Sequence, residues 1–152
     1  HGLPIISFVD TPGFMVGPDS EKEGAFRRMG ELFKHGARIK TPLVGIILRR
    51  GYGLGAMAMM GGSFVDPIYS ASWPNGEFGG MGLEGYVKLG FKKELEAEET
   101  EEKKKALFDK LVARMYEVGK ATEAAAHLEM DAVIDPASTR ETILKAFKSF
   151  GA

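Results

Sequence analysis

The stretch "TPLVGIILRRGYGLGAMAM", residues 41–59, decides the fold class. Its apolar run at 42–48 leads into a glycine-rich turn at 51–55, and small apolar residues follow. This order is typical of a buried strand that ends in a tight turn and leads into a packed helix. Residues 41–59 therefore predict a strand–turn–helix junction in an α/β protein.

Upstream of this junction, a second apolar run at 4–9 predicts another buried strand. Ser20 and Glu23 have the spacing of a capping box, and the apolar residues that follow recur at helical spacing, which predicts one helix over 20–36. Strand, helix and strand in this order form a crossover unit, so we expect the two strands to be parallel neighbours.

Downstream, turn residues and apolar periodicity divide the chain into further short elements. Residues 92–105 are a charge run, which is typical of a solvated helix start that Thr100 can cap. The remaining expectations are a strand at 67–73, a helix from Gly82, a long helix carrying the apolar residues of 107–118, a short strand at 132–134 and a terminal helix behind a Ser138–Glu141 capping box.

Composition narrows the functional classes. The 152 residues are 44% hydrophobic, enough for a core, and we expect a single domain over 1–152. A net charge of −1 gives no basic footprint, so neither a nucleic acid nor a membrane is an expected partner. The absence of cysteine excludes thiolate catalysis and suits a reducing compartment such as the cytoplasm. Because the chain starts at His1 and enters a strand almost at once, we expect an N-terminal part to be missing.

The motif "FVDTPGF", residues 8–14, resembles the strand end at which many GTPases present a magnesium-binding aspartate. A GTPase also needs a phosphate cradle of the form GxxxxGK[ST], and the sequence has none. Asp10 and Gly13 can instead fix a tight turn. A GTP-binding module reading Asp10–Gly13 stays as a minor alternative.

The glycine-rich turn offers main-chain chemistry. The first N–H groups of a helix have no internal partner, so the Leu54 and Gly55 amides could bind an oxyanion, with Gly53 permitting the turn. A similar junction, "WPNGEFGGMGLEG" at 73–85, holds Gly80, Met81 and Gly82. Parallel strands would bring both junctions to one sheet edge. The glycines could equally serve only tight helix–strand packing.

Side-chain chemistry is sparse by comparison. The three histidines show no metal-ligand spacing, so no metal is expected from this chain. Glu77 and Glu84 are the acids nearest the glycine turns, but glycines separate them and nothing places them as a catalytic pair. Main-chain electrostatics is therefore the chemistry that the residues favour.

The quoted motifs resemble one family when they are taken in order. "PIISFVDTPGFMVG", "TPLVGIILRRGYGLGAMAM", "SASWPNGEFGGMGLEG" and "AVIDPASTRETI" are similar to the C-terminal half of the carboxyltransferase subunit of biotin-dependent acyl-CoA carboxylases, of the propionyl-CoA and methylcrotonyl-CoA carboxylase type. The similarity covers nearly the whole chain, and the charge run at 91–105 is its least distinctive part.

The resemblance implies a crotonase-like fold, an α/β spiral of ββα units. It implies transfer of a carboxyl group from N-carboxybiotin, carried on a carrier domain, to the α-carbon of an acyl-CoA. The implied partners are a biotin carboxylase and biotin carrier subunit, and the N-terminal carboxyltransferase half of a neighbouring subunit in a homo-oligomer. The fragment alone should then be inactive, and a eukaryotic homologue would lie in the mitochondrial matrix.

The family pattern also implies site residues. Leu54 and Gly55 would be the oxyanion donors next to Gly53, Met57 would lie beside the acyl group, and the pocket would further include Gly80, Met81, Gly82, Asp10, Pro12, Gly13 and Phe14. Two positions depart from the family: many relatives have Gly or Ala at Leu54, and several have an acid at Met57. The acyl group therefore stays open. A different crotonase-fold acyl-CoA enzyme, a decarboxylase or a hydratase, is the main alternative.

Overall fold

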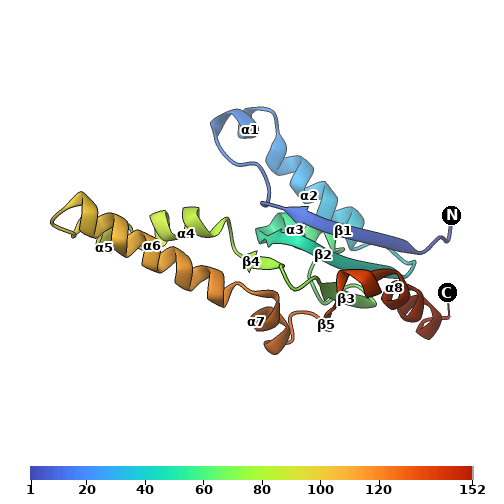
Figure 1. Cartoon of the computed structure of the whole chain (residues 1–152). Helices are drawn as coiled ribbons and strands as arrows, with labels where there is room; N and C mark the ends of the chain where they lie inside the picture. The colour runs from blue at the N-terminus through green and yellow to red at the C-terminus, as the bar shows by residue number, and fades with distance from the viewer. Residues whose placement is uncertain (152) are drawn as a thin grey trace.

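A parallel sheet forms the centre of the computed structural model, which describes residues 1–151 (Figure 1). Its strand order is β1-β2-β3-β5, and β4 pairs with β2 beyond the end of β3. All of these ladders are parallel. The strands are β1 (Ile5–Thr11), β2 (Leu43–Tyr52), β3 (Tyr69–Ser72), β4 (Glu77–Gly79) and β5 (Ala132–Val133).

The predicted pairing of the first two strands is confirmed. Ile5 lies opposite Leu43 and Val9 opposite Ile47, in parallel register. The single helix predicted over 20–36 is wrong, because the chain forms α1 (Pro18–Lys22) and α2 (Ala25–Gly36). Gly24 breaks the helix with a φ of 75°, a left-handed conformation that glycine adopts without strain.

The predicted capping box at Ser20 does not form either. Ser20 lies inside α1, because Pro18 already starts that helix at its first position. Its hydroxyl instead donates to the Met15 carbonyl, at 3.2 Å.

Two helices cover opposite faces of the sheet. Helix α3 (Gly53–Met59) packs with Val9 and Ile47 on one face, and α8 (Thr139–Ser149) packs with Val44 and Ile46 on the other. Successive side chains of β2 thus point to alternate faces, and both faces are buried. The unbroken apolar run of this strand follows from that double burial.

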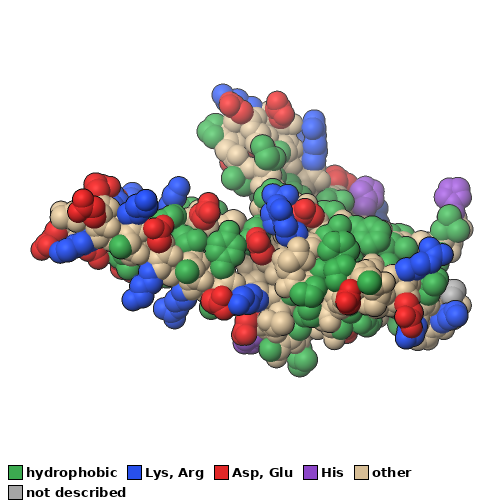
Figure 2. All heavy atoms as spheres, in the orientation of Figure 1, with side chains coloured by type: hydrophobic (Ala, Val, Ile, Leu, Met, Phe, Trp, Pro, Cys, Tyr) green, Lys and Arg blue, Asp and Glu red, His purple; other side chains and the backbone are tan. Residues whose placement is uncertain are grey.

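A helical arm extends away from the sheet, as Figure 1 shows. It consists of α4 (Leu83–Gly90), α5 (Lys92–Glu96) and α6 (Glu101–Val118). Figure 2 shows both acidic and basic side chains along this arm. The predicted cap is confirmed, because the Thr100 hydroxyl accepts from the Lys103 N–H at 3.2 Å.

After the arm, the chain returns to the sheet through α7 (Ala121–Ala126). Two main-chain bonds fix this return, from Phe78 N–H to the Gly119 carbonyl (2.7 Å) and from Ala121 N–H to the Gly76 carbonyl (3.0 Å). Within residues 1–151, no helix has the length and apolar character that a membrane span requires.

The C-terminal cap also differs from its prediction. Asp135 accepts from the Ala137 N–H at 2.8 Å and caps a short 3-10 turn, η1 (Pro136–Ser138), that leads into α8. Ser138 donates to the Asp135 carbonyl at 2.8 Å and makes no capping bond to α8. Since Pro136 begins the turn before Ser138, the predicted capping box with Glu141 does not form.

Candidate functional site

Two glycine-containing loops lie against the start of α3. A Cβ placed on Gly55 would lie 2.8 Å from the carbonyl carbon of Gly13 and 3.0 Å from the Phe14 nitrogen. A Cβ on Gly53 would lie 2.7 Å from the Gly80 carbonyl oxygen. Only glycine allows the main chains to come this close, so the sequence fixes this convergence at Gly53 and Gly55.

The start of α3 presents main-chain donors. The strand residue Tyr52 is its N-cap, and no described side chain bonds to the cap. The first intrahelical acceptor, the N-cap carbonyl of Tyr52, serves an N–H four residues later, so the Leu54 and Gly55 amides have no carbonyl partner inside α3. The Leu54 residue is 61% exposed, which leaves the outer side of this turn open to a ligand.

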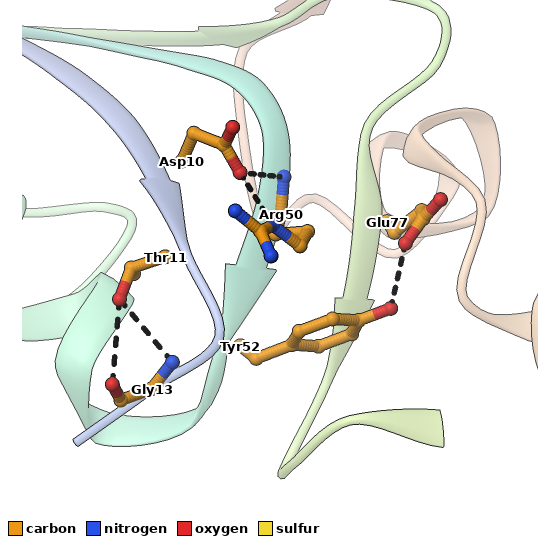
Figure 3. Close-up of polar contacts among 6 residues, drawn as sticks. All are labelled: Asp10, Thr11, Gly13, Arg50, Tyr52 and Glu77. Carbon is orange, nitrogen blue, oxygen red and sulfur yellow. Dashed lines mark hydrogen bonds and ion pairs between the residues drawn. The ribbon is translucent and has the colours of Figure 1, made fainter. Parts of the chain in front are cut away.

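The strand before the Gly13 turn ends in an ion pair (Figure 3). Asp10 Oδ1 accepts from Arg50 Nε at 2.7 Å and from the Arg50 main-chain N–H at 3.2 Å. The hydrogen bond from the Arg50 side chain lowers the pKa of Asp10 below its usual value. The carboxylate that a GTPase would use for magnesium is therefore bonded to an arginine.

A second tie joins β2 to β4. Tyr52 donates its hydroxyl hydrogen to Glu77 Oε2 at 2.8 Å, as Figure 3 shows. Burial raises the pKa of Tyr52 strongly, and the bond to Glu77 raises it further. The hydroxyl thus stays protonated at any physiological pH and continues to donate.

The other predicted site residues occupy several surroundings. Phe14 packs edge-on against Phe33, with 6.3 Å between ring centroids. Met57 is half-buried on α3. Met81 lines a cavity of about 430 Å³ between α4, α6 and α7, together with Gly80. Gly82 lines a different cavity of about 360 Å³ beside Arg50 and Tyr52.

The structure therefore brings Gly13, Gly53, Gly55 and Gly80 together, and Phe14 through its main chain. Met81 and Gly82 lie along the same loop but face separate cavities, and their part in the site stays a prediction. Met57 stays a prediction as well.

Sequence reasoning missed two residues beside this site, Arg50 and Tyr52, and it missed the role of Glu77. The signal for the first was present, because Asp10 and Arg50 carry opposite charges at the ends of two strands predicted to be parallel neighbours. Glu77 gave no such signal, since strand β4 was not predicted and its three residues lie within a glycine-rich stretch.

The comparisons with known proteins first identify the fold. The structure of transcarboxylase 12S, determined with methylmalonyl-CoA bound, superposes with a TM-score of 0.86 at 27% identity, covering 99% of this chain and 28% of that one. With its parallel α/β sheet, the chain has the crotonase-like fold expected from its sequence, and that prediction is confirmed.

The family follows from the sequence match. Residues 1–150 match the carboxyl transferase domain family, and the chain belongs to it. The chain is 30% identical to the methylmalonyl-CoA carboxyltransferase 12S subunit of Propionibacterium freudenreichii, covering 97% of this chain and 28% of that subunit. It is 32% identical to the carboxyltransferase subunit of propionyl-CoA carboxylase from Haloferax mediterranei, covering 93% and 27%.

A further structural relative is more similar in sequence. The structure described as a single-chain, multi-domain long-chain acyl-CoA carboxylase shares 54% identity, with a TM-score of 0.82. The match covers 95% of this chain and 14% of that one. This chain thus spans less than a third of each of these three relatives.

Proposed function

We propose that this chain is the C-terminal, biotin-side half of an acyl-CoA carboxylase carboxyltransferase. In this proposal, the complete protein moves a carboxyl group from N-carboxybiotin to the α-carbon of an acyl-CoA. The observation that carries it is the start of α3, where the main chains of Gly13 and Gly80 lie against Gly55 and Gly53, on either side of the Leu54 N–H in sequence. Membership of the carboxyl transferase domain family supports it.

The residues present fit the biotin group. Bound carboxybiotin supplies the carboxyl group, and its ureido oxygen gains negative charge as that group leaves. Two successive N–H groups, at Leu54 and Gly55, can donate hydrogen bonds to such an oxygen. Because the loops of Gly13 and Gly80 hold this turn, the donors are preorganised, and one donor of this kind contributes about 100- to 1,000-fold in rate.

We further propose a long-chain acyl-CoA as the substrate. The relative with 54% identity is described as a long-chain acyl-CoA carboxylase. Leu54 and Met57, the two positions that depart from the family pattern, are both apolar, and the Leu54 residue is exposed. An apolar surface beside the acyl group favours a hydrocarbon chain over a polar one.

The proposed partners follow from the same relatives. We infer that a biotin carboxylase and a biotin carrier work with this chain, on the same polypeptide or as separate subunits. We also infer that the N-terminal carboxyltransferase half of a neighbouring copy completes the pocket. Ile6 and Phe8 of β1 are exposed and line a groove of about 450 Å³ against α8. They add apolar surface that a neighbouring half could bury.

The test uses the full-length protein with its biotin carboxylase, the biotinylated carrier, ATP and labelled bicarbonate. Acetyl-CoA, propionyl-CoA and palmitoyl-CoA are compared as acceptors. We expect acid-stable label in the acyl-CoA only with the biotinylated carrier, and the highest kcat/KM with palmitoyl-CoA. Label that appears equally without biotin would contradict the proposal.

The site assignment has its own variant. Leu54→Pro deletes one N–H at the second position of a helix, where the first turn tolerates proline, and should lower kcat by about 100-fold or more. Leu54→Ala keeps the N–H and should lose much less. Glu102→Pro, at the same helical position of α6 in the distant arm, is the matched control and should leave kcat unchanged.

A decarboxylase is the second candidate. The alpha subunit of methylmalonyl-CoA decarboxylase from Veillonella parvula is 30% identical over 145 residues, covering 95% of this chain and 26% of that subunit. Product analysis separates the two. A decarboxylase releases carbon dioxide from a carboxylated acyl-CoA, and it forms no carboxylated acyl-CoA from bicarbonate and ATP.

A further inference from the structure

The parallel ladder between β1 and β2 is interrupted just before the Gly13 turn. Val9 pairs with Ile47, but the next paired residue, Thr11, lies opposite Gly51. A single residue of β1, Asp10, therefore faces a bulge of three residues in β2, which ends at Arg50. A bulge removes ladder hydrogen bonds, and the main-chain groups within it need other partners.

The Asp10 side chain supplies that partner. Its Oδ1 accepts the main-chain N–H of Arg50 at 3.2 Å, and the same oxygen accepts from Arg50 Nε at 2.7 Å. Figure 3 shows both bonds reaching one carboxylate oxygen from one arginine. Asp10 thus joins the two strands across the gap in their ladder.

The turn that follows is held against α3. The Thr11 hydroxyl oxygen accepts from the Gly13 N–H at 3.2 Å, and Gly13 has a φ of 105°. The Gly13 main chain then lies against Gly55: a Cβ placed on Gly55 would be 2.8 Å from the Gly13 carbonyl carbon and 2.9 Å from its Cα. Only two residues therefore separate Asp10 from the main chain that lies against Gly55.

We propose that Asp10 is a positioning residue for the carboxyl-transfer site: its tie to Arg50 across the bulge sets the Gly13 turn against Gly55, and so fixes the direction of the Leu54 and Gly55 amides. This inference rests on the proposed function. Asp10 contacts no reacting atom in this account and acts through Arg50 and Gly13.

The main-chain bond makes a specific prediction about the two partners. Arg50→Ala removes the guanidinium but keeps the N–H that Asp10 accepts, whereas Asp10→Ala removes both bonds. We therefore expect the aspartate variant to be the more damaging one. Asp10→Asn keeps an acceptor oxygen for the Arg50 N–H, and we expect it to restore most of the lost rate.

The experiment measures kcat and KM for palmitoyl-CoA carboxylation by the full-length protein with its biotinylated carrier. We expect Asp10→Ala to lower kcat about tenfold and to leave KM within about twofold, because misdirected amides weaken the transition state without affecting acyl-CoA binding. The double variant Asp10→Ala/Arg50→Ala should be no slower than Asp10→Ala alone, since both act on one tie. Glu141→Gln, which breaks an exposed ion pair on α8, is the control and should leave kcat unchanged.

Three results would overturn the inference. The first is an unchanged kcat in folded Asp10→Ala, and the second is a rise in the KM of Asp10→Ala by the same factor as its kcat falls. The third is a double variant whose factor of loss in kcat is the product of the factors of the two single variants. If Asp10→Ala fails to fold, Asp10→Asn and Arg50→Ala decide the matter: the arginine variant should have the lower kcat and both should keep KM within about twofold. Equal kcat values in these two variants, or a raised KM, would then overturn the inference. A wild-type protein that transfers no carboxyl group would instead defeat the proposed function, and this inference with it.

Discussion

Single glycines determine how closely the main-chain segments of the site approach one another. Gly55 is buried, and the atoms nearest to its missing Cβ, apart from its own helix, belong to the main chain of Gly13 and Phe14. A flexible side chain could move aside, but a main chain held by the Asp10 tie and the Thr11 turn cannot do so cheaply. The amide geometry thus depends on the lack of one methyl group.

Gly55→Ala should consequently destabilise the protein by about 1–3 kcal/mol and slow carboxyl transfer, because the new Cβ overpacks a site where only main-chain atoms can yield. Thermal unfolding of the full-length protein and the transfer assay measure the two effects. The matched control is Gly30→Ala in α2, where no atom outside the adjoining part of that helix lies within 4 Å of the new Cβ, and which should stabilise the helix by about 0.5–1 kcal/mol. Equal Tm values for the two variants would contradict this account of Gly55.

At the scale of elements, the β1–α–β2 unit and the junction at α3 could be predicted from sequence, because long apolar runs and glycine turns carry a strong local signal. The break at Gly24 could not, since a glycine inside an amphipathic pattern is compatible with a continuous helix. Strand β4 has three residues, too few for any periodicity. The ties from Asp10 to Arg50 and from Tyr52 to Glu77 depend on strand register and on that missed strand, so they appear only in three dimensions.

The cap of α6 is an element whose strength can be measured. Thr100→Ala removes the oxygen that accepts the Lys103 N–H and should cost about 0.5–2 kcal/mol. Thr100→Ser keeps that oxygen and should recover most of the loss. Hydrogen exchange in residues 101–106 gives a local readout, and equal protection in the alanine and serine variants would show that the cap contributes nothing.

The tie between β1 and β2 predicts a pH dependence. Because the bond from Arg50 lowers the pKa of Asp10, the folded protein binds fewer protons there than the unfolded chain does, between the lowered pKa and the ordinary pKa of 3.8. Stability from this pair is therefore present above about pH 4 and falls as the pH drops through the lowered pKa. Asp10→Asn should flatten the fall of Tm at acid pH. The control is Glu31→Gln on α2, measured at an ionic strength that screens the exposed pair of Glu31 with Lys34, and it should keep the same fall of Tm as the wild type. An Asp10→Asn profile parallel to that of the wild type would contradict the role of this pair.

For the whole molecule, the proposed function makes this chain one side of a pocket. It covers 28% of the methylmalonyl-CoA carboxyltransferase 12S subunit, and the start of α3 lies open beside the exposed Leu54. In the proposed function, the neighbouring half covers this side and brings the acyl-CoA opposite the biotin. The 152-residue chain alone should then catalyse no transfer, although it already holds the main-chain donors.

The most direct measurement is a structure of the full-length assembly with a biotinylated carrier and acyl-CoA bound. The account predicts the ureido oxygen of biotin within about 2.7–3.1 Å of the main-chain nitrogens of Leu54 and Gly55, with the Gly13 turn and the Asp10–Arg50 tie unchanged. A ureido oxygen held by a side chain, or by another part of the assembly, with both of these nitrogens out of hydrogen-bonding reach, would contradict it.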